Sequence, residues 1–200
     1  MVDREKIKHL VDAGLVYVQV GIQSGSKKGK EIYKRTYHNS QLLKAYEIID
    51  EFKDRITARQ YHVILDNPWE TEEDLIKTLM LLSGLPVPYE LVLFFLTFYP
   101  GTELYSLAEK DGFIGDKIKN IYHKNYRLYA PKSNLYLNNI FFLLSNSVEL
   151  GKRISPRIMF LLTNKVFRKS GLSSLIYYCL LFRIKNYPPP KKLLESLKDA

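Results

Sequence analysis

Polar residues gather in three short segments of the sequence, and each segment follows a run of apolar residues. They are Gly-Ile-Gln-Ser-Gly-Ser at 21–26, Leu-Asp-Asn-Pro-Trp-Glu-Thr at 65–71 and Phe-Tyr-Pro-Gly-Thr at 98–102. The first offers an amide and hydroxyls that suit ribose hydroxyls or a carboxylate. The second offers the carboxylate of Asp66 beside a rigid turn. The third is a tight turn whose glycine lets the backbone approach a ligand.

The rest of the first hundred residues predicts the elements that would position these segments. Composition indicates strands at 15–22, 57–65 and 90–97, and apolar spacing indicates helices at 3–13, from 39 or 40 to 52, from 71 to 84 and at 103–110. Such β-α repeats build parallel sheets, whose ligands bind beyond the carboxyl ends of the strands. Three strands cannot close a barrel. We therefore expect open sheet edges, covered by a partner or by more of a longer chain.

The order of the three segments resembles the second half of the radical S-adenosylmethionine (radical SAM) fold. In that family Gly-Ile-Glu/Gln-Ser-Gly ends the fourth strand, Gly-x-Pro-x-Glu-Thr-x-Glu-Asp follows the fifth, and Pro-Gly-Thr-Glu-Leu follows the sixth. The resemblance covers residues 5–115 and is nearest to the branch with cobalamin-dependent methyltransferases, cyclases and oxidoreductases. It implies an α/β fold: residues 1–115 form a partial (β/α) barrel of three parallel strands, and 116–200 form a mainly helical extension.

The resemblance also implies roles for individual residues. Gln23 and Ser24 would contact S-adenosylmethionine at its ribose or its methionine part. Arg35 would lie near the methionine carboxylate, although a solvated helix charge explains it equally well. His62, Asp66 and Tyr99 are candidates to face the substrate, with structural packing as the alternative for His62 and turn capping for Asp66.

Two departures from the family pattern limit these expectations. The Cys-x-x-x-Cys-x-x-Cys loop, whose thiolates bind three irons of a four-iron four-sulfur cluster, is absent, and Cys179 is the one cysteine of the sequence. Without that loop we expect this chain alone to be inactive, and we assign it no catalytic residue and no metal ligand. Asp66 stands where the family usually has glycine.

Charge is distributed unevenly along the chain. Residues 1–100 hold 13 Lys and Arg against 14 Asp and Glu, whereas residues 101–200 hold 17 against 7. Helices are predicted at 138–149, 157–169 and 172–184, and basic residues flank their apolar runs. Such helices either pack on the barrel or lie on an anionic membrane surface. We do not expect nucleic acid as a partner, because the tyrosines and lysines of 117–136 more often serve packing.

Two interpretations of function remain open. In the first, the chain is part of a radical SAM methyltransferase or oxidoreductase, and a missing N-terminal half brings the cluster and, in some family members, a cobalamin domain. In the second, it is a stand-alone half barrel that binds a partner protein or an anionic surface. The charged N-terminus is no signal peptide, and the cytoplasm is the expected location.

Overall fold

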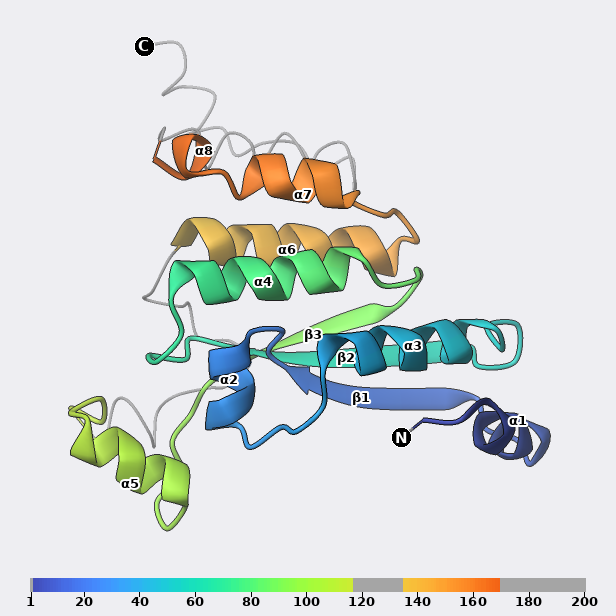
Figure 1. Cartoon of the computed structure of the whole chain (residues 1–200), viewed down its shortest axis with the longest axis horizontal. Helices are drawn as coiled ribbons and strands as arrows, with labels where there is room; N and C mark the ends of the chain where they lie inside the picture. The colour runs from blue at the N-terminus through green and yellow to red at the C-terminus, as the bar shows by residue number, and fades with distance from the viewer. Residues whose placement is uncertain (1, 117–134, 170–200) are drawn as a thin grey trace.

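The computed structural model describes residues 2–116 and 135–169 and has a mixed α/β fold (Figure 1). Its elements follow one another in chain order as α1 (Arg4–Asp12), β1 (Tyr17–Gln23), α2 (Lys27–Ile32), α3 (Asn39–Asp50), β2 (Ala58–Leu65), α4 (Glu72–Ser83), β3 (Glu90–Phe95), α5 (Glu103–Lys110), α6 (Leu135–Glu149), α7 (Pro156–Leu162) and α8 (Lys165–Lys169).

The three strands form one parallel sheet in the order β1-β2-β3. Gln19 lies opposite Gln60 across the first pair, and Gln60 lies opposite Glu90 across the second. The predicted strands agree with the observed ones within two residues at each end. The predicted parallel pairing is therefore confirmed. The register of β1 shifts between Gly21 and Gln23, where the strand ends.

One face of the sheet is buried under helices. Successive side chains of a strand point to opposite faces, and β2 accordingly alternates between buried and more exposed residues along its whole length. The buried face carries Val18, Val20, Ile22, Arg59, Tyr61, Val63, Leu65, Leu91, Leu93 and Phe95. Tyr61 stacks between Tyr46 and Tyr89, with ring centroids 4.2 and 4.8 Å away.

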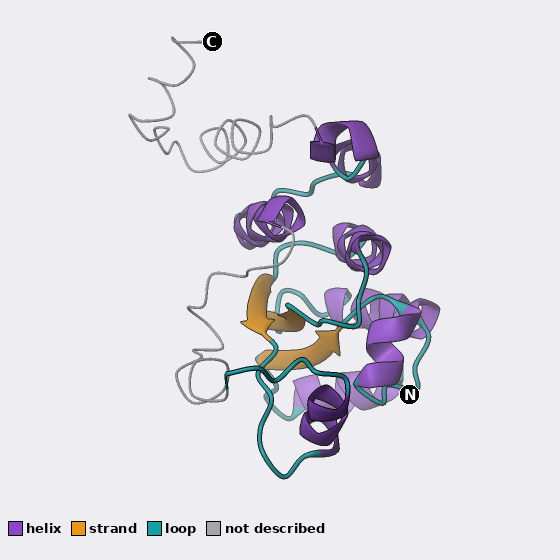
Figure 2. Cartoon of the chain, turned by 90° about the vertical axis from the view of Figure 1, so that its left-hand side faces the viewer, coloured by secondary structure: helices purple, strands orange, loops and turns teal. Residues whose placement is uncertain are grey.

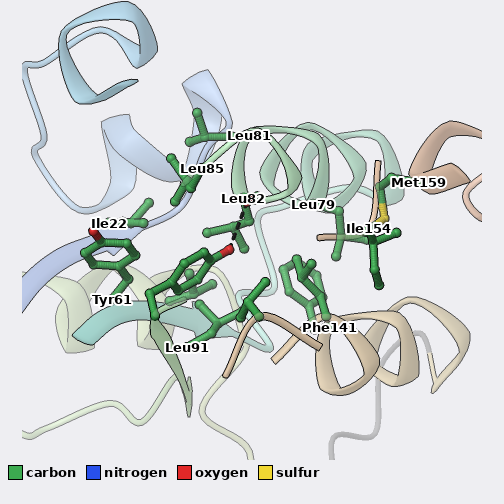
Figure 3. Close-up of a cluster of buried hydrophobic side chains, with 14 of the residues drawn as sticks. Ile22, Tyr61, Leu79, Leu81, Leu82, Leu85, Leu91, Phe141, Ile154 and Met159 are labelled. Carbon is green, nitrogen blue, oxygen red and sulfur yellow. Dashed lines mark hydrogen bonds between the residues drawn. The ribbon is translucent and has the colours of Figure 1, made fainter. Parts of the chain in front are cut away.

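Helices α4 and α6 lie side by side over this face, and α7 lies on their far side (Figures 1 and 2). The core between helices and sheet contains Leu79 and Leu82 of α4 and Phe141 of α6. All three are fully buried and pack in one cluster with Tyr61 (Figure 3). Ser145 of α6 donates a hydrogen bond to the Leu91 carbonyl of β3 at 2.8 Å. The described part of the predicted extension thus shares its hydrophobic core with the sheet.

The buried face also holds one ion pair. The Arg59 guanidinium lies 2.5 Å from the Asp50 carboxylate, and the Arg59 side chain is only 4% exposed. This contact ties β2 to the end of α3. Because a buried charge is costly unless it is paired, the pair is a positional constraint more than a source of stability.

Three helix predictions need correction. The chain between 157 and 169 forms two helices, because the Thr163 hydroxyl bonds back to the Met159 carbonyl while Asn164 caps the next helix at the Val166 amide. Helix α3 starts at Asn39, as expected, but ends at Asp50 and not at Phe52; at its start the Gln41 side chain accepts from the His38 amide. Helix α2 was not expected from the apolar spacing. The predicted helix at 172–184 lies outside the described residues.

Candidate functional site

The second face of the sheet carries a connected row of polar side chains. The Tyr17 hydroxyl lies 3.0 Å from both the Gln19 and the Gln60 side-chain oxygens. Gln19 Nε2 lies 3.2 Å from His62 Nδ1, and His62 Nε2 lies 2.7 Å from Gln60 Oε1. Gln60 Nε2 donates to the Glu90 carboxylate at 2.7 Å. The row therefore crosses all three strands, and these side chains hold one another in place.

This polar row was not foreseen, although the sequence contains its signal. The strands looked apolar on nearly every residue, a pattern typical of sheets covered on both faces. The polar residues recur with period two at 17 and 19 in β1, at 60 and 62 in β2 and at 90 in β3. That period places all of them on one face. We call this surface the open face.

The open face turns apolar toward the carboxyl ends of the strands. Phe94 of β3 meets the His62 ring edge-on, with the centroids 4.9 Å apart. Ile64 packs against a second hydrophobic cluster built from Leu96, Phe98, Ala108 and Ile114. Polar groups beside an apolar wall are the usual lining of a site for a small organic ligand.

Gln23 lies at the end of β1 with a positive φ of 56°. A Cβ placed on Gly21 would come within 2.6 Å of the Gln23 amide nitrogen, so the Gln23 side chain folds back over this glycine. Gly21 pairs with His62 across the sheet. The structure therefore places Gln23 and His62 on the same face of the sheet, on neighbouring strands. The Gln23 Oε1 atom is buried and accepts no hydrogen bond from the described residues.

Ser24 occupies a different environment from Gln23. Its side chain is buried, and its hydroxyl lies 2.6 Å from the Glu70 carboxylate, 3.1 Å from the Ser26 hydroxyl and 3.3 Å from the Thr78 hydroxyl. The Ser26 hydroxyl also donates to Glu70, at 2.7 Å. We call Ser24, Ser26, Glu70 and Thr78 the serine–glutamate network. It ties the loop after β1 to the loop after β2.

Glu70 is the centre of this network, and the sequence had not singled it out. Burial raises the pKa of the Glu70 carboxyl, and hydrogen bonds from Ser24 and Ser26 oppose that rise. Burial also raises the pKa of the neighbouring Tyr33 hydroxyl, and the charge of Glu70 adds to that effect. A Cβ on Gly29 would lie 2.3 Å from the Ser24 hydroxyl, so the helix that follows approaches the network closely.

Asp66 and Tyr99 stand at the ends of β2 and β3. Asp66 is half-buried and has a positive φ of 63°, a conformation that aspartate tolerates better than most residues. Tyr99 is 57% exposed. Trp69, in the loop after β2, packs edge-on against Phe98 and donates from its ring nitrogen to Asp111 at 2.8 Å. Helices α2 and α5 lie at this end of the sheet, to which the strand arrows point (Figure 1).

Arg35 lies on the helical side of the molecule. It is exposed and lines a cavity of about 560 Å³ together with Lys27, Lys30 and Lys77. Lys30 donates to the Asn39 side chain at 2.6 Å, and burial lowers the pKa of the Lys30 ammonium. The cavity is basic overall, which suits an anionic group. The role inferred for Arg35 toward a carboxylate stays a prediction.

The chain's own residues do not fit an iron–sulfur cluster. Among residues 2–116 and 135–169, no three His, Cys, Asp or Glu side chains come together as they would around a metal ion. The whole sequence supplies one thiol, Cys179, which lies outside the described residues. A four-iron cluster is held by several cysteine thiolates. Gln23 is partly exposed at the end of β1, and its side-chain amide is a group that can contact an organic ligand.

No model of a known protein family matches the chain, and no curated protein matches it.

Proposed function

We propose that this chain is part of a radical SAM enzyme, a methyltransferase or an oxidoreductase, whose cofactor and substrate pocket includes the open face. In this proposal the sheet is three strands of a (β/α) barrel, and the open face looks into the barrel. Gln23 would contact S-adenosylmethionine on this face, and the cofactor, together with a four-iron four-sulfur cluster held by another segment, would supply the chemistry for hydrogen abstraction from the substrate.

The single observation that carries this proposal is the polar row on the side of the parallel sheet that faces away from the main core of the described residues. Side chains such as Gln19, His62 and Gln60 hold fixed hydrogen-bonding positions on that side, while the other side is filled by the core. The polar row lies toward the amino ends of the strands, and three segments that resemble the family's motifs follow their carboxyl ends. A binding face, rather than a second packing face, is the arrangement these contacts favour.

Individual residues take the following parts in the proposal. The Gln23 side chain, which is partly exposed, contacts the cofactor's ribose through its amide group. Ser24 acts from within the serine–glutamate network by fixing the loop that carries Gln23, since its hydroxyl is already bonded to Glu70. His62, Asp66 and Tyr99 face the substrate. The apolar wall at Ile64 and Phe94 keeps water from the reacting carbon.

The cluster requires another polypeptide segment, because this chain has one cysteine. We propose that an N-terminal half supplies the three-cysteine loop and the remaining strands, with a cobalamin domain before it in the variants that use this cofactor. The cytoplasm is the proposed location. Among the described residues no helix is long and apolar enough to cross a membrane.

One observation favours the alternative, a stand-alone half barrel that binds a partner protein. A groove of about 740 Å³ runs beside β1 and is lined mainly by apolar residues, among them Val20, Leu42 and Tyr46. A partner strand or helix could bury this groove and pair with the edge of the sheet.

The DNA upstream of Met1 separates the two proposals. A coding frame with a Cys-x-x-x-Cys-x-x-Cys loop within roughly 100–150 residues, half of a typical barrel, supports the enzyme. A promoter and a start codon at that place support the binding module.

If the frame exists, the joined polypeptide should convert S-adenosylmethionine to 5′-deoxyadenosine under reducing conditions. Replacing Gln23 by Leu should lower that rate by about tenfold, the effect of one lost hydrogen bond. The matched control is Lys53→Ala at the opposite end of the sheet, which should leave the rate unchanged. An equal loss in both variants would argue against a cofactor contact of Gln23.

A further inference from the structure

Four large apolar side chains lie exposed on the outermost helical layer. Ile158, Phe160 and Leu161 of α7 are 50%, 66% and 52% exposed, and Val166 of α8 is 74% exposed. We call these four residues the α7–α8 patch. Exposed apolar residues are ordinary when they are scattered, but four of them within nine positions of the chain form a concentrated surface.

The patch cannot turn inward, because the other side of α7 is already packed. Met159 and Leu162 are 0% and 6% exposed and belong to the main core. The Tyr136 hydroxyl of α6 donates to the Leu162 carbonyl at 2.6 Å. Helix α7 is thus apolar on the side that meets the protein and on the side that meets its surroundings. A helix that is apolar all round normally has an apolar environment on both sides.

Helix α8 is also fixed to the body of the protein. Its Arg168 side chain is 12% exposed and forms an ion pair with Glu72 at the start of α4. The ion pair holds Val166 in its exposed position next to α7. The patch is therefore a feature of the folded chain and not of a loosely attached end.

The charged residues of the segment that carries the patch are all basic. Residues 150–169 contain six Lys and Arg and no Asp or Glu. Arg157 and Lys165 are exposed and stand next to the patch residues Ile158 and Val166. A protein partner would need a matching acidic and apolar surface. An anionic lipid surface supplies negative headgroups and an apolar interior together.

From these observations we propose that the α7–α8 patch binds the surface of a membrane that contains anionic lipid. The apolar side chains enter the boundary between headgroups and acyl chains, and Arg157 and Lys165 contact the headgroups. The protein rests on the membrane without crossing it, which agrees with the absence of a spanning helix among the described residues. This interaction is separate from the pocket proposed on the open face.

The test is sedimentation of the full chain with vesicles of phosphatidylserine and phosphatidylcholine. We expect the chain to co-sediment with these vesicles but not with pure phosphatidylcholine vesicles, and added salt should reduce binding. Arg157→Gln should weaken binding by about fivefold, as one surface-proximal basic residue contributes about that factor. Leu161→Gln should weaken it by at least as much.

Leu10→Gln is the matched control. Leu10 also lies in a helix and is 52% exposed, the same fraction as Leu161, but it belongs to α1 outside the patch. Circular dichroism checks that each variant folds. Failure of the chain to bind anionic vesicles, equal binding to neutral vesicles, or equal losses in Leu161→Gln and Leu10→Gln would each overturn the proposal.

Discussion

Glu70 has the most consequential environment of any single residue described. Its carboxylate accepts hydrogen bonds from two serine hydroxyls in the loop after β1, and burial raises its pKa. Two hydroxyl donors offset part of the cost of taking a carboxylate out of water. The remaining desolvation cost of the Glu70 carboxylate should make the stability of the fold depend on pH.

The raised pKa of Glu70 predicts a loss of stability as pH rises. The folded state holds the proton more tightly than the unfolded state does, so this contribution is complete below the ordinary glutamate pKa and disappears as pH rises through the folded value. Glu70→Gln should flatten that dependence at pH values above the ordinary glutamate pKa, measured by urea unfolding. Glu73→Gln, an exposed change in the next helix, should keep the wild-type slope. An unchanged slope in Glu70→Gln would contradict this account.

Gly29 should tolerate no side chain. A Cβ at this position would lie 2.3 Å from the Ser24 hydroxyl and 2.4 Å from the Glu70 carboxylate. Alanine has a higher helix propensity than glycine, but the steric overlap should outweigh this gain. The substitution should destabilise the fold by about 1–3 kcal/mol. Thermal unfolding of Gly29→Ala and of Lys28→Ala, an exposed neighbour in α2, makes the comparison. If Gly29→Ala were more stable than the wild type, the serine–glutamate network would have to shift at little energetic cost, which would contradict the prediction.

At the scale of elements, the helices are set by their ends as well as by their apolar faces. Helix α4 begins with a reciprocal cap, in which the Thr71 hydroxyl accepts from the Asp74 amide and the Asp74 carboxylate accepts from the Thr71 amide. Burial works against ionisation of Asp74, but hydrogen bonds from Thr71 and Lys77 prevail and lower its pKa. The cap fixes where the helix leaves the loop that carries Glu70.

Thr71→Ala should therefore destabilise the protein by about 1 kcal/mol, the usual effect of a lost helix cap. Thr71→Ser keeps the capping oxygen and should stay within a few tenths of a kcal/mol of the wild type. Chemical denaturation measures both. Equal losses in the two variants would indicate that the threonine methyl group, and not the cap, is what matters.

At the scale of the whole molecule, α6 and the inner side of α7 complete the core that covers the sheet. Phe141 is buried in the same cluster as Tyr61 and Leu79, although some 60–80 positions separate them in the sequence. Phe141→Ala should cost about 3–5 kcal/mol, because it opens a cavity in this shared core. Phe160→Ala, at a 66% exposed position, should cost far less. Similar losses would mean that α6 is not part of the cooperative unit.

A second prediction for the whole molecule concerns iron. The chain alone should remain colourless after anaerobic incubation with iron and sulfide, because one cysteine cannot replace the several thiolates that a four-iron cluster needs. Visible absorption spectra measure this, and Cys179→Ala should behave like the wild type. A brown chain with the absorption of a four-iron cluster would contradict the need for an N-terminal half.

The sequence by itself determined the strands, their parallel order and most helix limits, because these depend on local composition, turn residues and capping groups. Thr71 as a helix cap and the strand end at Leu65 could be predicted in this way, and the predicted end of the first strand at Ile22 is one residue from the observed end at Gln23. The division of 157–169 into two helices could not, because the hydrogen bonds of Thr163 and Asn164 compete with a continuous apolar pattern.

Only the tertiary structure decided what the candidate site residues do. Gln23 and Ser24 are neighbours in the sequence, yet Gln23 lies over Gly21 on the open face while Ser24 is held by Glu70, 46 positions away. Arg35 lines a cavity among the helices. The physical reason is that a side chain's partners depend on contacts between distant segments, and no local pattern contains them. The same holds for the α7–α8 patch, whose exposure is set by the packing of Met159 and Leu162.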